Sequence, residues 1–255
     1  MIPEERRKNI LIKLKENDFL GIEELASELN VSKITIVRDI QILKNNGLVE
    51  KIHGGIKLNE KSTGDFESRF FVRMQDNYSK KVEIAKKSLE FLKNKDTVFL
   101  DSSSTVFVFA QEIFNSSVEE RNLITNSPAI LVEALNKPNV NLISTGGELK
   151  QEFNIFGGNW VNEFLENLNI DAAFISAAGI SSNLDITTNN KDLAGMLGTI
   201  FKKAKEINLL IDSTKFYKEG MLSIASISDC RRVITDKEIS EEVKKVLIKE
   251  TELII

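Results

Sequence analysis

The N-terminal fold is determined by the stretch VSKITIVRDI, residues 31–40. Ser32 is well placed to cap a helix, because its hydroxyl can accept a hydrogen bond from a free backbone N–H of the first turn. Apolar Ile36 and Ile40 then recur at helical spacing, which gives the helix one face for packing and leaves the other exposed. The sequence therefore predicts a helix over about 32–46.

Two further helices are expected before this stretch, and a hairpin after it. Apolar residues recur at helical spacing in 3–17 and in 22–29, and residues 30–31 make a tight turn before the third helix. Residues 48–52 and 56–58 are short and β-like. A helix pair with a tight turn and a β-wing is typical of a winged helix-turn-helix, which places its second helix in the major groove of DNA.

The predicted DNA contacts lie on the third helix and on the wing. Outward positions near the start of the helix face the bases, cations further along suit phosphates, and glycines let the backbone approach a phosphate closely. In the wing, His53 has an alternative structural role, and on the helix Arg38 and Asp39 can form an ion pair that orients the arginine, which is compatible with a DNA contact. The candidate DNA-binding residues are Ser32, Lys33, Ile34, Thr35, Val37, Arg38, Lys44, Lys51, His53, Gly54 and Gly55.

The composition is that of a globular protein. Of the 255 residues, 42% are hydrophobic and 28% are charged. A single cysteine excludes an internal disulfide and a single histidine excludes a multi-histidine zinc site, so we expect no metal and no cofactor. The charged N-terminus and the lack of a long apolar run predict a cytoplasmic protein without a membrane span. Five basic residues against two acidic ones over 33–57, in a chain of net charge −4, indicate a local basic surface.

From about residue 79 the pattern changes to short apolar strands that alternate with helices. This alternation predicts a mostly parallel sheet covered on both faces by helices. The polar segment before it is expected to be an extended linker, partly ordered by Phe66, Phe70 and Phe71. The predicted organisation is a winged helix-turn-helix over 1–58, a linker over 59–78 and an α/β domain over 79–255.

Polar loops follow several of the predicted strands of the α/β domain. In a parallel sheet these loops gather at the carboxyl ends of the strands, where α/β proteins bind ligands. Hydroxyls and free N–H groups at the start of a helix suit an anion such as phosphate, and a lysine adds a point charge. Plainer roles as helix caps or turns stay open for each of these residues. The candidate effector-binding residues are Asp101, Ser102, Ser103, Ser104, Thr105, Thr125, Asn126, Ser127, Gly146, Gly147, Asp212 and Lys215.

Three segments of the N-terminal part resemble the DeoR/GlpR family of bacterial regulators in residue type, order and spacing. They are GIEELA at 21–26, VSKITIVRDI at 31–40 and GLVEKIHGG at 47–55. The polar loops of the α/β domain, together with DAAFISAAG at 171–179, resemble the sensor domain of that family in the same order. The resemblance implies a sensor similar in fold to sugar-phosphate isomerases and CoA transferases.

The resemblance also implies a function. A family member would bind double-stranded operator DNA as a homo-oligomer, a dimer or a tetramer. It would act as a repressor of a sugar or carbohydrate operon, under the control of a phosphorylated sugar. The chain departs from the family pattern at Val37, where a second arginine is usual, and at Leu193, Leu197 and Gly198, where a glutamate and a Lys-Arg pair are usual.

Two other classes of function stay open at this point. One is a sugar-phosphate isomerase that carries a DNA-binding module, and the other is a DNA-binding protein that senses no ligand. Isomerase chemistry needs a general base beside the substrate carbon, for which Asp101 and Asp212 are the candidates. Because the charged residues of the altered helix are missing, we expect that the protein is not an enzyme.

Overall fold

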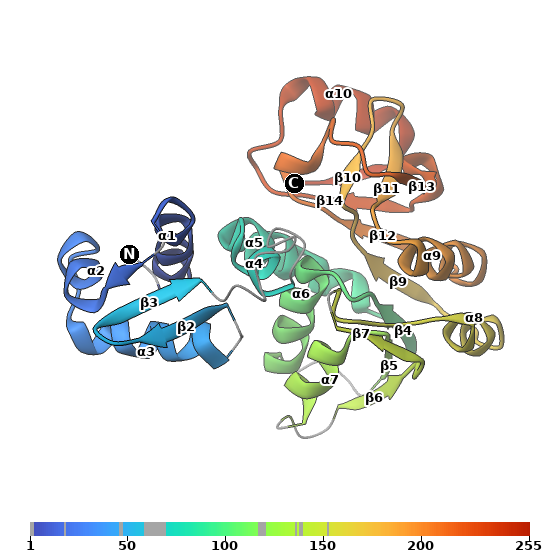
Figure 1. The fold of residues 1–255 in the computed structure, drawn as a ribbon. Coiled ribbons are helices and arrows are strands. Elements are labelled where there is room, and N and C mark those ends of the chain that lie inside the picture. Colours follow the sequence, from blue (N-terminus) through green and yellow to red (C-terminus); the bar gives the residue numbers. More distant parts are fainter. Residues whose placement is uncertain are drawn as a thin grey trace. The chain divides into compact units, whose positions relative to one another are not determined.

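The computed structural model describes residues 3–17, 19–45, 48–58, 70–116, 121–135, 137, 140–151 and 153–255. The chain divides into two compact units, residues 1–78 and 79–255 (Figure 1). Each unit has an apolar core of its own, as expected of separate domains.

The first unit has the winged helix-turn-helix fold that the sequence predicts. Its small sheet is antiparallel, in the order β1-β3-β2. The sheet consists of β1 (Leu20–Gly21), β2 (Val49–Ile52) and β3 (Gly55–Leu58), and the described helices are α1 (Pro3–Glu16), α2 (Ile22–Glu28), α3 (Lys33–Asn45) and α4 (Phe70–Gln75).

Helix α3 begins at the predicted cap. The Ser32 hydroxyl accepts a hydrogen bond from the backbone N–H of Thr35 at 3.2 Å, which satisfies one of the free donors of the first turn. The apolar face of the helix is fully buried, with Ile36 and Leu43 each at 0% exposure. This face packs in a core shared with α1, α2 and the wing, so the opposite face is left on the surface.

The second half of the predicted linker is ordered, but as helix and not in the extended conformation that the sequence analysis expected. Residues 70–75 form helix α4, and helix α5 begins at Tyr78. Phe70 is buried, so an apolar side chain accounts for local order in a segment of otherwise polar composition. Residues 59–69 of the linker lie outside the described residues.

The second unit contains a seven-stranded sheet in the order β15-β14-β12-β9-β4-β5-β6, with every neighbouring pair parallel. The predicted mostly parallel sheet is therefore confirmed. Its strands are β4 (Thr97–Leu100), β5 (Asn122–Thr125), β6 (Asn141–Ser144), β9 (Ala172–Ile175), β12 (Ile207–Leu210), β14 (Arg232–Ile234) and β15 (Glu252–Ile254).

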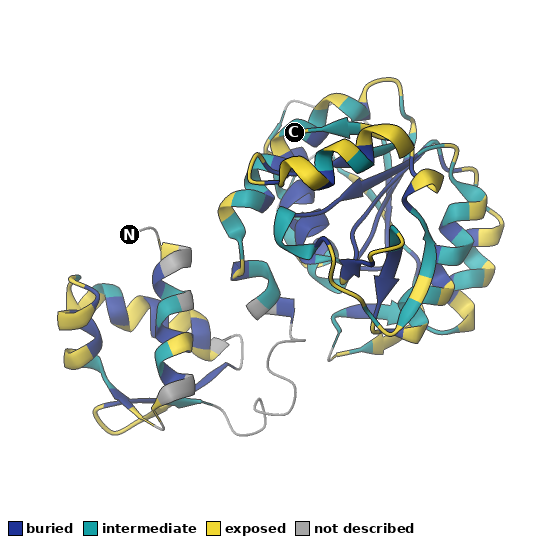
Figure 2. Cartoon of the chain, turned by 90° about the horizontal axis from the view of Figure 1, so that it is seen from above, coloured by how far each residue is buried: buried dark blue, intermediate teal, exposed yellow. Residues whose placement is uncertain are grey.

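Helices surround this sheet, and their outer sides are exposed while the inner strands of the sheet are largely buried (Figure 2). Strands β9 and β12 are buried at every position, as expected where both faces of a sheet are covered. The α-helices are α5 (Tyr78–Ser88), α6 (Ser104–Asn115), α7 (Pro128–Ala134), α8 (Asn159–Glu166), α9 (Lys191–Lys203) and α10 (Glu241–Glu250), and the 3-10 helices are η3 (Leu89–Leu92), η4 (Ser213–Lys215) and η5 (Ile227–Asp229).

Two small antiparallel elements are additions that the sequence analysis did not predict. One is a three-stranded sheet in the order β10-β11-β13, and the other is the hairpin β7-β8. Their bounds are Glu148–Lys150 for β7, Ile155–Gly157 for β8, Gly179–Ile180 for β10, Asp185–Thr188 for β11 and Leu222–Ser226 for β13.

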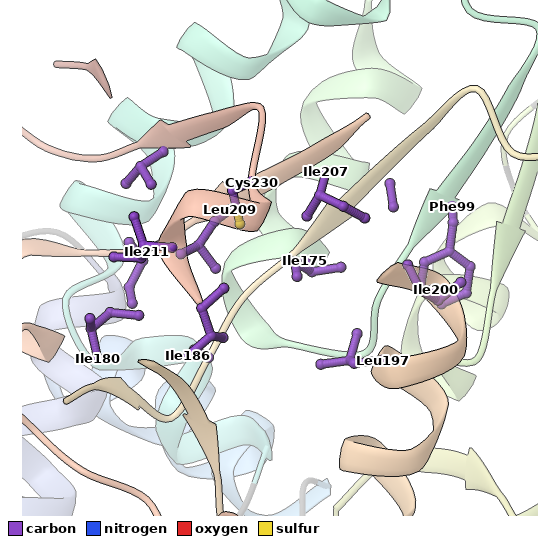
Figure 3. Close-up of a cluster of buried hydrophobic side chains, with 14 of the residues drawn as sticks. Phe99, Ile175, Ile180, Ile186, Leu197, Ile200, Ile207, Leu209, Ile211 and Cys230 are labelled. Carbon is purple, nitrogen blue, oxygen red and sulfur yellow. The ribbon is translucent and has the colours of Figure 1, made fainter. Parts of the chain in front are cut away.

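The core of the second unit joins the sheet to helix α9. Ile175 of β9 and Leu209 of β12 lie in one apolar cluster with Leu197 and Ile200 of α9 (Figure 3). Leu197 and Ile200 are each at 0% exposure. This face of α9 is therefore structural, and it fixes the helix on the sheet.

The strand order of the seven-stranded sheet contains a reversal of direction. From β4 the chain builds the sheet outward through β5 to β6, and from β9 it builds in the opposite direction through β12 and β14 to β15. The direction reverses between the neighbours β4 and β9, so their carboxyl ends form a topological switch point. Open α/β sheets bind ligands in the crevice outside such a point.

Candidate functional site

Helix α3 is tied to helix α1 by a buried ion pair. The Asp39 carboxylate accepts hydrogen bonds from Arg6 Nε at 2.5 Å and from Arg7 Nη1 at 3.3 Å. The Asp39 side chain is only 3% exposed, so the guanidinium groups compensate a charge that water does not reach. The alternative pairing of Asp39 with Arg38 is wrong, because the carboxylate faces α1 and Arg38 is exposed.

The outward face of α3 carries most of the predicted DNA contacts. Ile34 is 67% exposed and Val37 is 41% exposed, and Arg38 and Lys44 are exposed as well. Thr35 is half-buried, and its Oγ1 lies 2.8 Å from the Ser32 Oγ. The hydroxyls of Ser32 and Thr35 are therefore engaged at the start of the helix, while the other predicted positions stay accessible.

Lys33 has a partner that the sequence analysis did not identify. Its ammonium donates to the Glu23 carboxylate of helix α2, and this hydrogen bond lowers the pKa of Glu23. Both side chains are exposed, so water screens the pair and its contribution to stability is small. A nearby acid of this kind reduces the positive charge that Lys33 offers to DNA.

The wing exposes three of its four predicted contacts. Lys51, His53 and Gly54 are exposed, and Gly54 adopts a φ of +80° with no atom within 4 Å of a built Cβ. Gly55 is buried, and a Cβ there would lie 2.2 Å from the Leu20 carbonyl oxygen of β1. Packing against the chain's own backbone is therefore sufficient to require a glycine at position 55, and its contact with DNA stays a prediction.

In the second unit, Asp101 lies at the switch point. Its Oδ1 accepts the backbone N–H of Ser103 at 2.8 Å, and its Oδ2 accepts the backbone N–H of Ser176 at 2.8 Å. Asp101 thus bridges the carboxyl ends of β4 and β9. Burial raises its pKa to about 6, although hydrogen bonds from Ser103 and Ser176 oppose that shift.

The loop after β4 opens helix α6. Ser103 caps the helix, since its Oγ accepts the backbone N–H of Val106 at 3.2 Å. The neighbouring Ser102, Ser104 and Thr105 are buried. One hydroxyl is enough for the cap, so the other three are not explained by capping.

The loop after β5 lies beside the loop after β4. Asn126 Nδ2 donates to Ser102 Oγ and to the Phe156 carbonyl, each at 3.4 Å. Thr125 Oγ1 donates to the Leu100 carbonyl at 2.7 Å and accepts the Ser127 backbone N–H at 3.1 Å. Thr125 is therefore a structural residue of the strand end, while Asn126 links the two predicted loops.

The loop after β12 adds a cation to the same edge. Lys215 Nζ donates to the Ala177 carbonyl at 2.7 Å, just beyond β9, and its charge acts on Asp101. Asp212 Oδ1 accepts the Thr214 backbone N–H at 3.1 Å, which shapes the turn at η4. The predicted residues that follow β4, β5 and β12 are thus brought to one edge of the sheet.

The two predicted glycines after β6 have left-handed backbones, with φ of +63° at Gly146 and +109° at Gly147. A Cβ at Gly147 would lie 2.7 Å from the Gly157 carbonyl oxygen of β8, so close packing explains this glycine. Gly146 has open space around it.

Three buried polar atoms near the switch point lack a hydrogen-bond partner among the described residues. They are Thr105 Oγ1, Asn126 Oδ1 and Ser176 Oγ. Buried polar groups in proteins are normally paired, so atoms of this kind mark a place where a ligand or water completes the structure. Ser176 was not in the predicted set, although it follows strand β9 as the predicted residues follow theirs.

Lys80 was also missed, because nothing in its local sequence distinguishes it. Its ammonium donates to Ser213 Oγ at 2.9 Å and pairs with Glu238 at 2.8 Å and with Asp236 at 3.6 Å. Contacts with these carboxylates raise its pKa against the opposing effect of burial. The Lys80 ammonium therefore connects helix α5 to the loops that follow β12 and β14.

Packing explains the two leucines of helix α9 that stand where the family pattern usually has charged residues. Leu197 is part of the apolar core and Leu193 packs against that core, whereas Gly198 has no atom within 4 Å of a built Cβ. The two leucines therefore contribute apolar contacts in place of charge.

Within the described ranges, no helix is long and apolar enough to cross a membrane. Among the same residues, no group of three or more His, Cys, Asp or Glu side chains is arranged to hold a metal ion.

A winged helix-turn-helix unit and an α/β unit with polar side chains at a switch point define a DNA-binding transcriptional regulator with a sensor domain. The comparisons with known proteins agree. The DeoR-like helix-turn-helix domain matches residues 6–62, and the DeoR C-terminal sensor domain matches residues 76–237. The chain belongs to the DeoR family of transcriptional regulators.

Relatives resemble the chain over most of its length. The HTH-type transcriptional regulator GolR of Listeria innocua is 31% identical over 96% of this chain and 95% of its own. The L-fucose operon activator of Haemophilus influenzae is 31% identical over 88% of each chain, and the lactose phosphotransferase system repressor of Lactococcus lactis is 28% identical over 93% of this chain and 92% of its own. Among solved structures, ribose 5-phosphate isomerase A of Methanocaldococcus jannaschii covers 55% of each chain at 19% identity with a TM-score of 0.40, which is too remote to bear on activity.

Proposed function

We propose that the protein is a repressor of a carbohydrate operon, and that a phosphorylated sugar bound at the switch point of the sensor controls its affinity for operator DNA. The observation that carries the proposal is the set of buried, unpartnered polar atoms of Thr105, Asn126 and Ser176. Family membership supports a regulatory role, and the names of the fucose and lactose relatives support a carbohydrate operon. Because one of these relatives is an activator, repression is the part that needs its own test.

The proposed DNA contacts are the exposed side chains of α3 and the wing. Ile34 and Val37 face the bases, while Arg38, Lys44 and Lys51 contact phosphates, as does the backbone at Gly54. We further propose that the protein binds as a homo-oligomer, because paired recognition helices reach successive major grooves of a repeated site. In this scheme residues 1–58 read DNA, 59–78 connect and 79–255 sense the ligand.

The proposed effector site combines hydroxyls, amides and one cation. The start of α6 offers free backbone N–H groups and the buried hydroxyls of Ser102, Ser104 and Thr105 to a phosphate group. Lys215 supplies the positive charge. The sugar hydroxyls would reach Asn126 and Ser176.

The same geometry favours a regulator over an isomerase. Both carboxylate oxygens of Asp101 already accept backbone N–H groups, and Asp212 holds the turn at η4. A general base must be free to take a proton from the substrate carbon. The two candidate bases have structural roles instead.

A thermal-shift screen tests the effector site. A ligand bound only to the folded state at a hundredfold excess over its Kd stabilises by about 2.7 kcal/mol, which raises the melting temperature by about 5–10 °C for a domain of this size. We expect this rise with one phosphorylated sugar, and not with the same sugar without its phosphate. The absence of a shift with every compound in a broad panel would contradict the proposal.

Two threonine variants make the screen specific to the site. Thr105→Val removes an unpartnered hydroxyl, so it should keep or slightly raise the stability of the free protein while it removes the ligand-induced shift. Thr125→Val removes a hydroxyl with two hydrogen bonds, so it should lower the stability of the free protein. A reporter gene tests repression, since deletion of the regulator should raise expression of its target operon.

A further inference from the structure

The part of α3 that faces DNA is apolar where base contacts are expected. Ile34 is 67% exposed and Val37 is 41% exposed, and both lie in the first half of a 13-residue helix. They are three residues apart, so their side chains are neighbours on one face of the helix. Ile36 and Ile40 of the same helix are buried, so the exposed pair lies outside the side of the helix that packs in the core.

The polar groups at the start of this helix are already engaged. The Ser32 hydroxyl accepts the Thr35 backbone N–H and lies 2.8 Å from the Thr35 hydroxyl. The Lys33 ammonium donates to Glu23. Ser32 and Lys33 are exposed but already have partners within the chain, so the two branched apolar side chains, with Arg38 beside them as a cation, form the rest of the exposed surface at the leading end of the helix.

We infer that Ile34 and Val37 read the 5-methyl groups of thymine, so that the protein selects A·T base pairs at the operator positions under these two side chains. The inference rests on the proposed DNA-binding role of α3. In the major groove, thymine presents a methyl group at C5, whereas cytosine presents only a hydrogen there and a hydrogen-bond donor at N4. Apolar side chains contact the thymine methyl and leave the cytosine donor without an acceptor.

The size of the effect follows from burial of one methyl group. Removing one such group from water is worth about a four-fold change in affinity. Arg38 adds binding that does not depend on the base under Ile34, since phosphate contacts carry no sequence information. Loss of the methyl contact should thus weaken selectivity more than it weakens overall binding.

The experiment uses the full-length protein and random duplex DNA at fixed salt, with and without a mixture of phosphorylated sugars. Once a preferred duplex has been selected, each thymine in it is replaced singly by deoxyuridine, which removes the methyl group and keeps the base pairing. We expect about a four-fold loss of affinity at one or two thymines in each half-site. Replacing such a thymine by 5-methylcytosine, opposite guanine, should restore more affinity than cytosine does.

Variants assign the methyl contacts to residues. Ile34→Ala and Val37→Ala should each remove the penalty of deoxyuridine at one position, while the helix content of the protein stays unchanged. Ile42→Ala is the matched control, because Ile42 is 42% exposed on the same helix but outside the pair, and this variant should keep every penalty.

If a selected duplex binds equally well with deoxyuridine at every position, methyl reading is overturned while DNA binding stands. If no duplex is selected under either condition, the proposed function and the methyl reading both fail. A deoxyuridine penalty that persists in Ile34→Ala and in Val37→Ala would also contradict the assignment.

Discussion

Replacing Asp39 by asparagine should destabilise the DNA-binding unit and leave the sensor unit unchanged. The Asp39 side chain is 3% exposed, and its partners Arg6 and Arg7 are 9% and 11% exposed. Asparagine keeps the volume and removes the charge, so two guanidinium groups lose their buried counter-ion. Breaking a buried pair in this way costs about 3–5 kcal/mol, and we expect the lower end because an oxygen acceptor remains.

Native-state amide hydrogen exchange on the full chain measures this loss in each unit separately. A loss of about 3 kcal/mol should speed exchange of the best-protected amides of α3 by roughly two orders of magnitude. Amides of strand β4 in the sensor unit should exchange as in the wild type. Glu28→Gln is the control, because the Lys13–Glu28 pair is 36% and 41% exposed and should contribute less than about 1 kcal/mol. If Asp39→Asn speeds exchange in α3 no more than Glu28→Gln does, the reasoning about a buried ion pair is refuted.

Three further predictions concern single residues. Gly55→Ala should destabilise the wing by about 3 kcal/mol in thermal unfolding, because its Cβ would lie 2.2 Å from the Leu20 carbonyl oxygen. Gly54→Ala is the control and should cost only about 1–2 kcal/mol of backbone strain. Equal losses of stability in the two variants would contradict this prediction. Burial raises the pKa of Asp101 from 3.8 to about 6, so the folded sensor retains a proton that the unfolded chain loses in this window. The stability that Asp101 contributes, measured in urea titrations as the wild type minus Asp101→Asn, should therefore fall by an amount on the order of 3 kcal/mol as the pH rises from about 4 to about 6. A difference between the two proteins that grows with pH in this range would show that the sign is wrong. Burial also raises the pKa of the Cys230 thiol, so iodoacetamide should label it only when the sensor unfolds, and rapid labelling of the native protein would count against the structure.

Much of the architecture follows from local sequence patterns. The cap at Ser32 and the apolar spacing of Ile36 and Ile40 were enough to predict α3, because helix signals are local. The short apolar runs of the second unit were enough to predict the parallel strands, because strands buried on both faces need continuous apolar sequence. Strand β11 (Asp185–Thr188) was not predicted, because it has no apolar run or alternation that distinguishes it from a loop.

Parts of the candidate site depend on contacts between distant residues. Arg6 and Asp39 are 33 positions apart, and the choice between Arg38 and α1 as partner is made by tertiary packing. Gly55 was predicted to let a phosphate approach the backbone, and the pairing of β1 with β3, which is not visible in the local sequence, gives this glycine a second, structural reason. Ser176 could have been found by extending the strand-end rule to β9, the central strand beside β4.

The most direct test of the account is the affinity of the protein for its selected operator, measured with and without the phosphorylated sugar that stabilises it. We predict that saturating ligand changes the operator Kd by at least about five-fold, the usual lower range for coupling between two sites. Thr105→Val should bind the same operator with unchanged affinity and lose the response to ligand. An operator Kd that stays constant while the ligand is bound would contradict the claim that the sensor unit controls DNA binding.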